Sequence, residues 1–364
     1  MRLRDELPAC PRHPGSTVWR DGTYTTAAGP RPRYRCVPAN GDRPHRFTEA
    51  RGHAPRGSSH TTRDIAAVLA DVGRGLSYRE AAKKAAVDGN TVADWVEMYA
   101  PAIHARYARV RWPAVLELDS VAFRARAVGE GDESTAFQIF AALTPPRRGR
   151  AQLVALDVFP RDPPGGRQAL WEEFLSSLEG MPAQIVCAPD VDLVRAVAAV
   201  WPPDGPSPTV FLCHRHLSRE LLEIMQAAGI DPAARLYRAA ARALRNPAAW
   251  RRFLAEPPPR RLRALDAWIE LYGAQIASQL AHDAASTTTE LLDERLKLLH
   301  ARLANRRGNL RNRERTRRLL MLLELELNGQ GDPARYEEII REDLRRRGGR
   351  PPQRRKLGGA ALDS

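Results

Sequence analysis

The sequence predicts a mixed α/β core that is preceded by two small modules and interrupted by a helical insertion. Three observations carry this prediction. Between residues 112 and 216, apolar runs typical of strands alternate with two helical stretches. Residues 217–285 have helical composition with a few Pro breaks, and residues 1–58 have too few aliphatic side chains for a hydrophobic core. With 364 residues, the chain is long enough for two or three domains.

The N-terminal module, residues 1–58, contains four side chains that are suited to bind zinc. Cys10 and His13 form a closely spaced pair, and Cys36 and His45 form a wider one. A tetrahedral Zn²⁺ site through these four ligands would replace the missing core of a zinc-ribbon-like, DNA-binding module. The alternative is a disordered arm in which these residues are incidental.

Residues 59–110 predict a helix-turn-helix. A Gly-Arg-Gly break ends the first helix, and Ser77 with Glu80 three residues later forms a capping box for the second. Asn90 or Thr91 caps a third helix, which would be the DNA-recognition helix. A three-helix unit of this size can also be purely structural.

The core is predicted in two parts, over residues 111–216 and 286–328, with the helical insertion (217–285) between them. Trp250 and Trp268 in the insertion are expected to pack its core, and the alternative is stacking on an exposed base. The expected strands are 115–126, 136–143, 153–159, 184–188 and 209–212, and the expected helices are 168–178 and 193–200.

The chain is strongly basic, with a formal net charge of +14 and a sequence pI of about 10.3. This excess predicts a polyanionic partner. A high-GC genome would explain the preference for Arg over Lys but not the net charge. Residues 329–364 are expected to form a basic C-terminal tail. A second basic segment, expected to follow a phosphate backbone, contains Arg306, Arg307, Arg311 and Arg313.

No apolar run is long enough to span a bilayer, and the N-terminal residues lack the apolar core of a signal peptide. The four cysteines are scattered and do not predict a disulfide scaffold. These features predict a protein of the reducing cytosol with no membrane partner.

Three acidic residues lie at the ends of apolar runs or at the start of a predicted helix, where the fold would direct their carboxylates into a shared site. Asp119 ends the first apolar run, Asp190 follows the fourth, and Glu290 opens the helix after the insertion. Carboxylates from two strands and a helix can hold paired Mg²⁺ ions, which clamp the attacking and leaving oxygens of a phosphodiester. Alternatively, Asp119 is a turn or cap residue and Glu290 only favours a helix N-terminus through the dipole.

The chain resembles bacterial Mutator-like insertion-sequence transposases of the DDE class, which have an RNase H-like core. The resemblance runs from about residue 10 to residue 327. Its motifs are residues 116–120 (LELDS), 196–202 (AVAAVWP), 213–217 (CHRHL) and 287–290 (TTTE), followed by Leu296 and Lys297. Each motif is weak alone, and their order is more specific.

The resemblance implies a transposase that cleaves DNA strands and transfers the freed 3′ ends, with Asp119 and Glu290 as ligands of two Mg²⁺ ions. It implies double-stranded DNA partners, namely terminal inverted repeats and target DNA, and a homodimer or larger synaptic assembly in a bacterial, nucleoid-associated setting. It also supports the zinc ribbon and the helical insertion. Cys213 and His216 match a family element whose expected role is structural or in DNA positioning.

One departure from the family concerns the second catalytic Asp. The family places it eight residues before the Ala of the Ala-Val pair, which here is Ala196, and that position holds Ala188. Either Asp190 takes over the role or one metal ligand is missing. Because metal coordination tolerates shifts of only a few tenths of an ångström, the favoured interpretation is an impaired site. The alternative function is then a non-catalytic, sequence-specific DNA-binding protein descended from a transposase.

Overall fold

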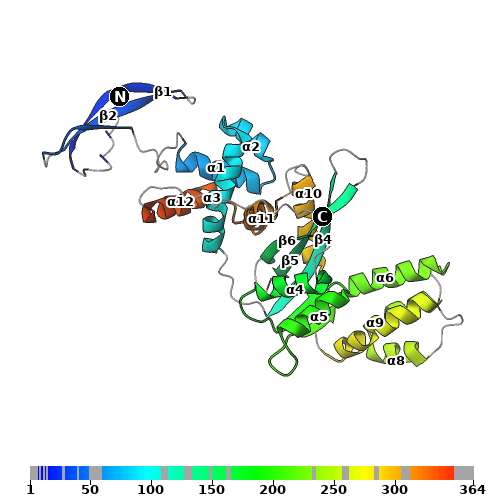
Figure 1. Ribbon diagram of the computed structural model, residues 1–364. Helices are drawn as coiled ribbons and strands as arrows, with labels where there is room; N and C mark the ends of the chain where they lie inside the picture. The colour runs from blue at the N-terminus through cyan, green and yellow to red at the C-terminus, as the bar shows by residue number, and fades with distance from the viewer. Residues whose placement is uncertain are drawn as a thin grey trace, which may run out of the picture. The chain divides into compact units, whose positions relative to one another are not determined.

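Two structural units divide the chain in the computed structural model (Figure 1). One comprises Met1–Tyr107 and Gly329–Lys356, and the other comprises Ala108–Asn328 and Leu357–Ser364. The structure describes residues 7, 10, 13, 15–26, 29–38, 41–48, 60–107, 114–126, 133–146, 150–160, 165–231, 235–255, 262–282, 287–304 and 312–347. No helix within these ranges is long and apolar enough to cross a membrane.

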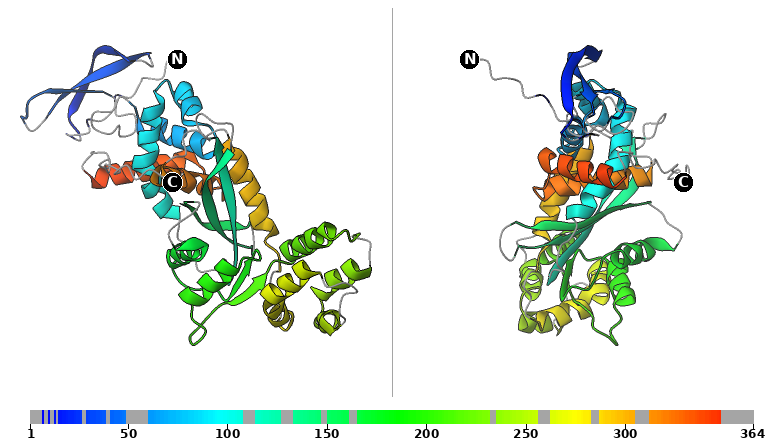
Figure 2. Two further views of the ribbon diagram at one scale, coloured as in Figure 1. Left: turned by 45° about the vertical axis from the view of Figure 1, so that its right-hand side comes forward. Right: turned by 90° about the vertical axis from the view of Figure 1, so that its left-hand side faces the viewer.

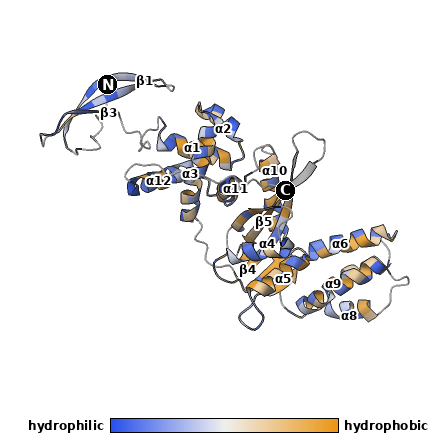
Figure 3. Cartoon of the chain, in the orientation of Figure 1, coloured by the Kyte–Doolittle hydropathy of each residue, from blue (hydrophilic) through white to orange (hydrophobic). Residues whose placement is uncertain are grey.

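The first unit begins with a small antiparallel sheet of β1 (Thr17–Thr26), β2 (Gly29–Val37) and β3 (His45–Thr48). Figure 3 shows that its strands carry few strongly hydrophobic residues. One of the few apolar contacts is the stack of the Tyr34 and Phe47 rings, whose centroids are 5.7 Å apart. This sheet therefore needs another source of stability than a hydrophobic core.

Three helices follow: α1 (Thr62–Gly73), α2 (Tyr78–Ala85) and α3 (Gly89–Tyr107). The predicted capping box of Ser77 and Glu80 is confirmed at the start of α2. The predicted cap of the third helix is corrected. The Asp88 carboxylate accepts the backbone N–H groups of Asn90 at 2.8 Å and Thr91 at 3.0 Å, and α3 begins at Gly89. Asp is a strong N-cap because its carboxylate satisfies unpaired N–H groups of the first turn.

Part of the predicted C-terminal tail is instead a helix, α12 (Pro333–Arg346), which packs against α1 and α3. Its buried residues, Tyr336, Ile339, Ile340 and Leu344, recur at helical spacing. Asp332 caps the helix and Pro333 occupies its first turn. Arg106 of α3 pairs with Glu342 at 2.7 Å. The segment is so rich in Arg that its composition predicts a basic tail, although its apolar residues form a stripe along one side of a helix. Residues 348–364 lie outside the described residues.

The second unit is built on a mixed sheet of five described strands: β4 (Val115–Arg126), β5 (Glu133–Thr144), β6 (Gln152–Phe159), β7 (Gln184–Cys187) and β8 (Thr209–Leu212). Their order is β6-β5-β4-β7-β8. The β4–β5 and β5–β6 pairs are antiparallel, and the β4–β7 and β7–β8 pairs are parallel. β4 is therefore central, with the parallel strands on one side only.

Helices cover both faces of this sheet (Figure 2). On one face, α4 (Gly166–Ser176) and α5 (Val191–Val200) pack on apolar side chains of β4, β5 and β7. The rings of Phe140 and Trp171 stack there at 3.9 Å between centroids. On the other face lies α10 (Glu290–Ala304), whereas α11 (Arg313–Leu327) packs against the edge strand β6. Because side chains alternate along β4, Leu118 and Ser120 face α4 whereas Glu117 and Asp119 face α10.

The helical insertion consists of α6 (His214–Ala227), α7 (Arg235–Ala243), α8 (Pro247–Ala255) and α9 (Arg263–Leu280). Trp250 and Trp268 are buried, which confirms core packing for both. The Gln279 side chain accepts the Leu212 N–H at 2.7 Å, and its amide donates to the Leu212 carbonyl at 3.4 Å. The Gln275 amide donates to the Val210 carbonyl at 2.6 Å. These side chains cover the outer edge of β8, where unpaired backbone groups would otherwise invite strand pairing.

Candidate metal centres

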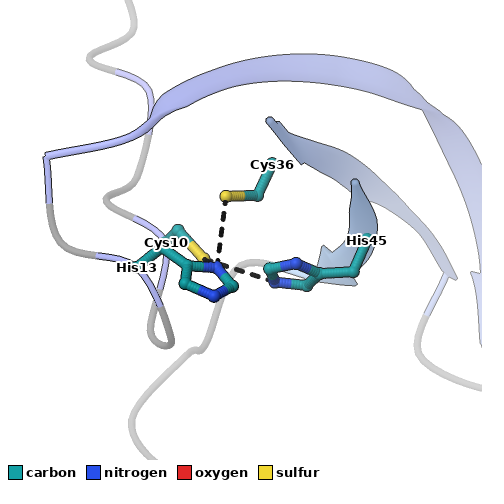
Figure 4. A group of neighbouring side chains, drawn as sticks. All are labelled: Cys10, His13, Cys36 and His45. Carbon is teal, nitrogen blue, oxygen red and sulfur yellow. Dashed lines mark hydrogen bonds between the residues drawn. The ribbon is translucent and has the colours of Figure 1, made fainter. Parts of the chain in front are cut away.

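The four predicted zinc ligands lie together in the first unit (Figure 4). Cys36 and His45 are opposite each other on β2 and β3, and Cys10 and His13 precede β1. The Cys10 Sγ is 3.3 Å from the His45 Nε2 and 3.9 Å from the His13 Nδ1. The Cys36 Sγ is 3.8 Å from the same His13 nitrogen. The four ligand atoms therefore surround one point.

The spacing of these atoms fits a tetrahedral zinc ion. Zn–S bonds of about 2.3 Å and Zn–N bonds of about 2.0–2.1 Å place neighbouring ligand atoms about 3.3–3.8 Å apart. Both thiols are buried. The His13 Nε2, which points away from the thiols, lies 3.3 Å from the Asp42 Oδ2. Such a carboxylate holds a ligating imidazole in one tautomer. Asp42 was not predicted from the sequence.

A second group of possible metal ligands, Asp119, His216 and Asp293, lies in the second unit with all ligand atoms within 4.8 Å of one another. Asp119 comes from the middle of β4, His216 from the first turn of α6 and Asp293 from the first turn of α10. The Asp119 Oδ2 is 3.9 Å from the His216 Nε2. Three segments distant in sequence therefore bring two carboxylates and an imidazole to one point.

Burial raises the pKa of Asp119 to about 6, although the Ser120 N–H, which donates to its Oδ1 at 2.7 Å, and His216 both lower it. The charge of Asp293 raises this pKa further. Two carboxylates this close together repel each other, and a cation between them would relieve that repulsion. The donor set of two carboxylates and one imidazole suits a divalent metal ion.

Cys213 and Thr289 orient His216. The Thr289 hydroxyl is 3.3 Å from the His216 Nδ1, and both its hydroxyl and its backbone N–H contact the Cys213 Sγ, at 3.4 and 3.3 Å. Burial raises the pKa of Cys213, but hydrogen bonds with His216 and Thr289 lower it to about 7. The hydrogen bond with Cys213 raises the pKa of His216, against burial. With its Nδ1 held by these groups, His216 presents its Nε2 to Asp119.

Glu290, the predicted third acid, stands outside this group. Its side chain is 59% exposed and pairs with Arg215 at 3.0 Å, whereas that of Asp119 is 15% exposed. The acid that faces Asp119 is Asp293, three residues further along α10. A helix turns about 300° in three residues, so these two carboxylates leave α10 at different positions around its axis. Asp293 precedes the buried Leu296 by three residues, a signal that could have indicated its inward position.

A buried acid that was not predicted, Glu117, ties the two elements together. It is 1% exposed, and its Oε2 accepts the Leu292 N–H at 3.2 Å. Burial raises its pKa to about 7, the hydrogen bond from Leu292 lowers it, and the charges of Cys213 and Asp293 raise it. Glu117 lies two residues before Asp119, and Leu292 directly precedes Asp293. This contact therefore joins the two segments that carry the site carboxylates.

Asp190 is engaged on the opposite face of the sheet. Its carboxylate caps α5 and accepts hydrogen bonds from the Arg167 Nε at 2.8 Å and the Trp171 indole at 3.1 Å. The same guanidinium donates to the Ser120 hydroxyl at 2.7 Å, on the face away from Asp119. Ala188, by contrast, directly follows β7, whose residue Cys187 pairs with Leu118. In that register, position 188 lies beside Asp119 and on the same face.

The predicted DNA contacts have different surroundings. In α3, Asn90 is exposed and Thr91 is held by Asp88, but most of the following turns are buried. Arg313 is committed within the second unit: it donates to the Val158 carbonyl at 2.8 Å, pairs with Glu173 at 2.7 Å and covers the Phe159 ring at 4.7 Å. A guanidinium with these partners anchors α11. Arg306, Arg307 and Arg311 lie outside the described residues.

Comparison with known proteins finds similarity to this chain among solved structures. No protein-family model matches it, and no curated protein matches it. Among solved structures, it is similar to the Drosophila P element transposase strand transfer complex, with 10% sequence identity and a TM-score of 0.27. The match covers 81% of this chain and 83% of that chain. A TM-score this low does not establish a shared fold.

Proposed function

We propose that this chain is a DNA-processing protein of the transposase class, with an RNase H-like core that binds divalent metal through Asp119, Asp293 and His216. One observation carries the proposal. The central strand of a sheet ordered β6-β5-β4-β7-β8 presents an acid to a second acid on a helix that follows a helical insertion. The sequence resemblance to Mutator-like transposases supports the finer assignment.

The residues have separate roles in this proposal. Asp119 and Asp293 supply negative charge, His216 supplies a neutral nitrogen, and Cys213 with Thr289 keeps that nitrogen directed at the site. These residues would hold a divalent ion, which would supply polarisation of a phosphoryl oxygen and a lowered pKa of bound water. Glu117 maintains the separation of the two carboxylates. The basic composition provides long-range attraction for DNA.

The missing acid at position 188 favours a second candidate, a DNA-binding protein of the same ancestry that no longer cuts. A methyl group stands beside Asp119, where the resemblance places a ligand. Asp190 is a cap and ion-pair partner on the other face, so it offers no replacement in this arrangement. We therefore favour weak or absent cleavage by the chain as it stands, with DNA binding retained.

The remaining assignments are part of the same proposal. Cys10, His13, Cys36 and His45 hold a structural Zn²⁺, and the first unit contributes to binding of double-stranded DNA. Terminal inverted repeats and target DNA are the expected ligands. A homodimer or larger synaptic assembly, in the cytoplasm of a bacterium and on its nucleoid, is the expected working form.

Metal binding by the full chain tests the core of this proposal. Mn²⁺ titration followed by electron paramagnetic resonance should detect a site in the parent protein. Asp119→Asn and Asp293→Asn should each weaken it by about 10-fold or more, because each removes a charged ligand. Glu290→Gln is the matched control and should leave the affinity within about twofold. If Glu290→Gln abolishes binding while Asp293→Asn does not, the ligand assignment is wrong.

A further inference from the structure

A polar pocket of about 550 Å³ opens beside the Asp119 group. Its lining residues come from the start of α6, the segment after α7 and the segment before α10. They are His214, Arg215, Ser218, Arg245, Thr287 and Thr288. The lining contains two guanidinium groups, one imidazole and three hydroxyl groups, with no acidic or aliphatic side chain. Such a lining suits an anion with several oxygen atoms.

The charge balance of the pocket is positive. Arg245 is exposed, and none of the ion pairs given for the described residues involves it. Arg215 has one counter-charge, Glu290, at 3.0 Å and in an exposed position. Among the described residues, Arg245 therefore has no ion-pair partner, and Arg215 is held by a pair that solvent screens.

The backbone adds to the positive electrostatic potential of the pocket. α6 begins at His214 without a side-chain cap, and α10 begins at Glu290, directly after the Thr287–Thr289 segment. The His214 N–H donates to the Thr287 carbonyl at 3.0 Å, so the two helix starts are held together. The positive ends of both helix dipoles therefore lie at the pocket. Their contribution reinforces that of the arginines.

The pocket shares its chain segments with the metal-ligand group. Arg215 is the residue before His216, and Thr288 is the residue before Thr289, which contacts His216. In both segments, a residue that lines the pocket is therefore the direct neighbour of a residue in or next to the Asp119 group. A nucleic acid strand has a phosphate at every nucleotide, so a strand entering the metal site would place another phosphate in this region.

We propose that this pocket binds a backbone phosphate of the nucleic acid strand that enters the metal site. The inference rests on the proposed function and extends it to substrate positioning. Arg215, Arg245 and the Thr287–Thr288 hydroxyls contact the phosphate, and Glu290 is the competing anion that the phosphate displaces from Arg215. In this assignment, Glu290 regulates access to the pocket and does not bind the metal.

The test measures DNA binding by the full chain without divalent metal, so metal binding does not contribute. Fluorescence anisotropy with a labelled 20-base duplex, and with its single strand, gives the affinity as a function of salt. Arg215→Ala combined with Arg245→Ala should weaken binding by about 10-fold or more and reduce the salt slope by about one, because the pocket neutralises one phosphate and each neutralised phosphate releases about one counterion. Glu290→Gln should strengthen binding severalfold.

Arg252→Ala is the matched control. It removes the same charge from an exposed position on α8, outside the pocket. If it weakens binding as much as Arg245→Ala, general electrostatics explains the effect and the pocket assignment is overturned. Unchanged binding by the Arg215/Arg245 double variant overturns it as well. A third outcome is that inorganic phosphate or pyrophosphate binds in a way that depends on Arg245, whereas Arg245→Ala leaves DNA binding unchanged. That result would assign the pocket to free anions and overturn the strand proposal.

The two proposals fail separately. If the Arg215/Arg245 double variant binds DNA normally while Mn²⁺ binding still depends on Asp119 and Asp293, only the phosphate inference is refuted. Loss of Mn²⁺ binding with an intact pocket effect would refute only the metal assignment. A parent chain that binds no DNA at low salt would refute both.

Discussion

Glu117 on β4 accepts the backbone N–H of Leu292 on α10 at 3.2 Å, and this contact joins the two elements that carry the site carboxylates. Glu117 is nearly inaccessible to solvent, so the N–H it satisfies would otherwise be unpaired in the interior. A buried carboxyl group two residues from Asp119 therefore has a positioning role that composition does not reveal. It also links the stability of the second unit to the geometry of its site.

Glu117→Ala should lower the stability of the second unit by about 1–3 kcal/mol, because it leaves the Leu292 N–H unsatisfied. It should also weaken Mn²⁺ binding, since Asp293 would lose its position. Glu117→Gln keeps an acceptor oxygen and should retain most of both properties. Urea unfolding and Mn²⁺ titration measure these effects, and equal losses in the Ala and Gln variants would contradict the hydrogen-bond explanation.

Ala188→Asp should enable or increase metal-dependent cleavage of DNA, because position 188 adjoins Asp119 on the same face of the sheet. Asp190→Ala should leave metal binding unchanged but destabilise the protein by about 1–2 kcal/mol, through loss of the α5 cap and the Arg167 ion pair. A nicking assay with both variants, and an unfolding curve for each, separates these outcomes. Robust cleavage by the parent chain that disappears in Asp190→Ala would show that Asp190 is the working ligand.

Removal of zinc should unfold the small N-terminal sheet, because its sequence has too few aliphatic residues for a hydrophobic core and the proposed metal site would stabilise it instead. Purified full chain should contain one zinc ion per molecule by atomic absorption, and Cys36→Ser should lose it. Asp42→Asn should keep zinc but bind it about 10-fold more weakly, as expected for loss of a carboxylate behind a ligating imidazole. Substoichiometric zinc in protein prepared without chelators would refute the site.

The first unit should lose stability at alkaline pH through Tyr99. Burial raises the pKa of Tyr99 to about 12, the charge of Asp343 on α12 raises it and Arg347 lowers it. Because the folded pKa exceeds the ordinary value of 10, the stabilising contribution is complete below pH 10 and is lost as the pH rises through about 12. Tyr99→Phe should therefore flatten the loss of stability over that interval. Circular dichroism of both proteins between pH 9 and 12 provides the measurement, and parallel curves would exclude Tyr99 as a cause.

Much of the fold could be predicted because its signals are local. The predicted strands 115–126 and 209–212 have the same bounds as β4 and β8, since apolar runs and flanking turn residues lie within a few positions. The capping box of Ser77 and Glu80 is a pattern of four consecutive residues. The Cys and His pairs of the N-terminal module also stand out, because a core-poor segment has few other reasons to contain them.

The sequence is less informative where a side chain's role depends on its direction. Glu290 and Asp293 both belong to the first turn of α10, and which of them meets Asp119 depends on how that helix docks on β4. Asp190 is an acidic residue that lies shortly after the fourth predicted strand, as a metal ligand would. Its carboxylate, however, caps α5 and pairs with Arg167 on the face of the sheet opposite Asp119. The α12 stripe was obscured by surrounding arginines.

The sequence by itself determined the element order, the net positive charge, the candidate Cys and His group of the N-terminal module and the place of Asp119 on a strand. These depend on periodicity and composition, which act over short stretches of chain. Only the tertiary structure decided that Asp293 and His216 join Asp119 and that Glu290 pairs with Arg215. Those outcomes depend on helix rotation, strand register and contacts between residues more than 70 positions apart, which no local pattern encodes.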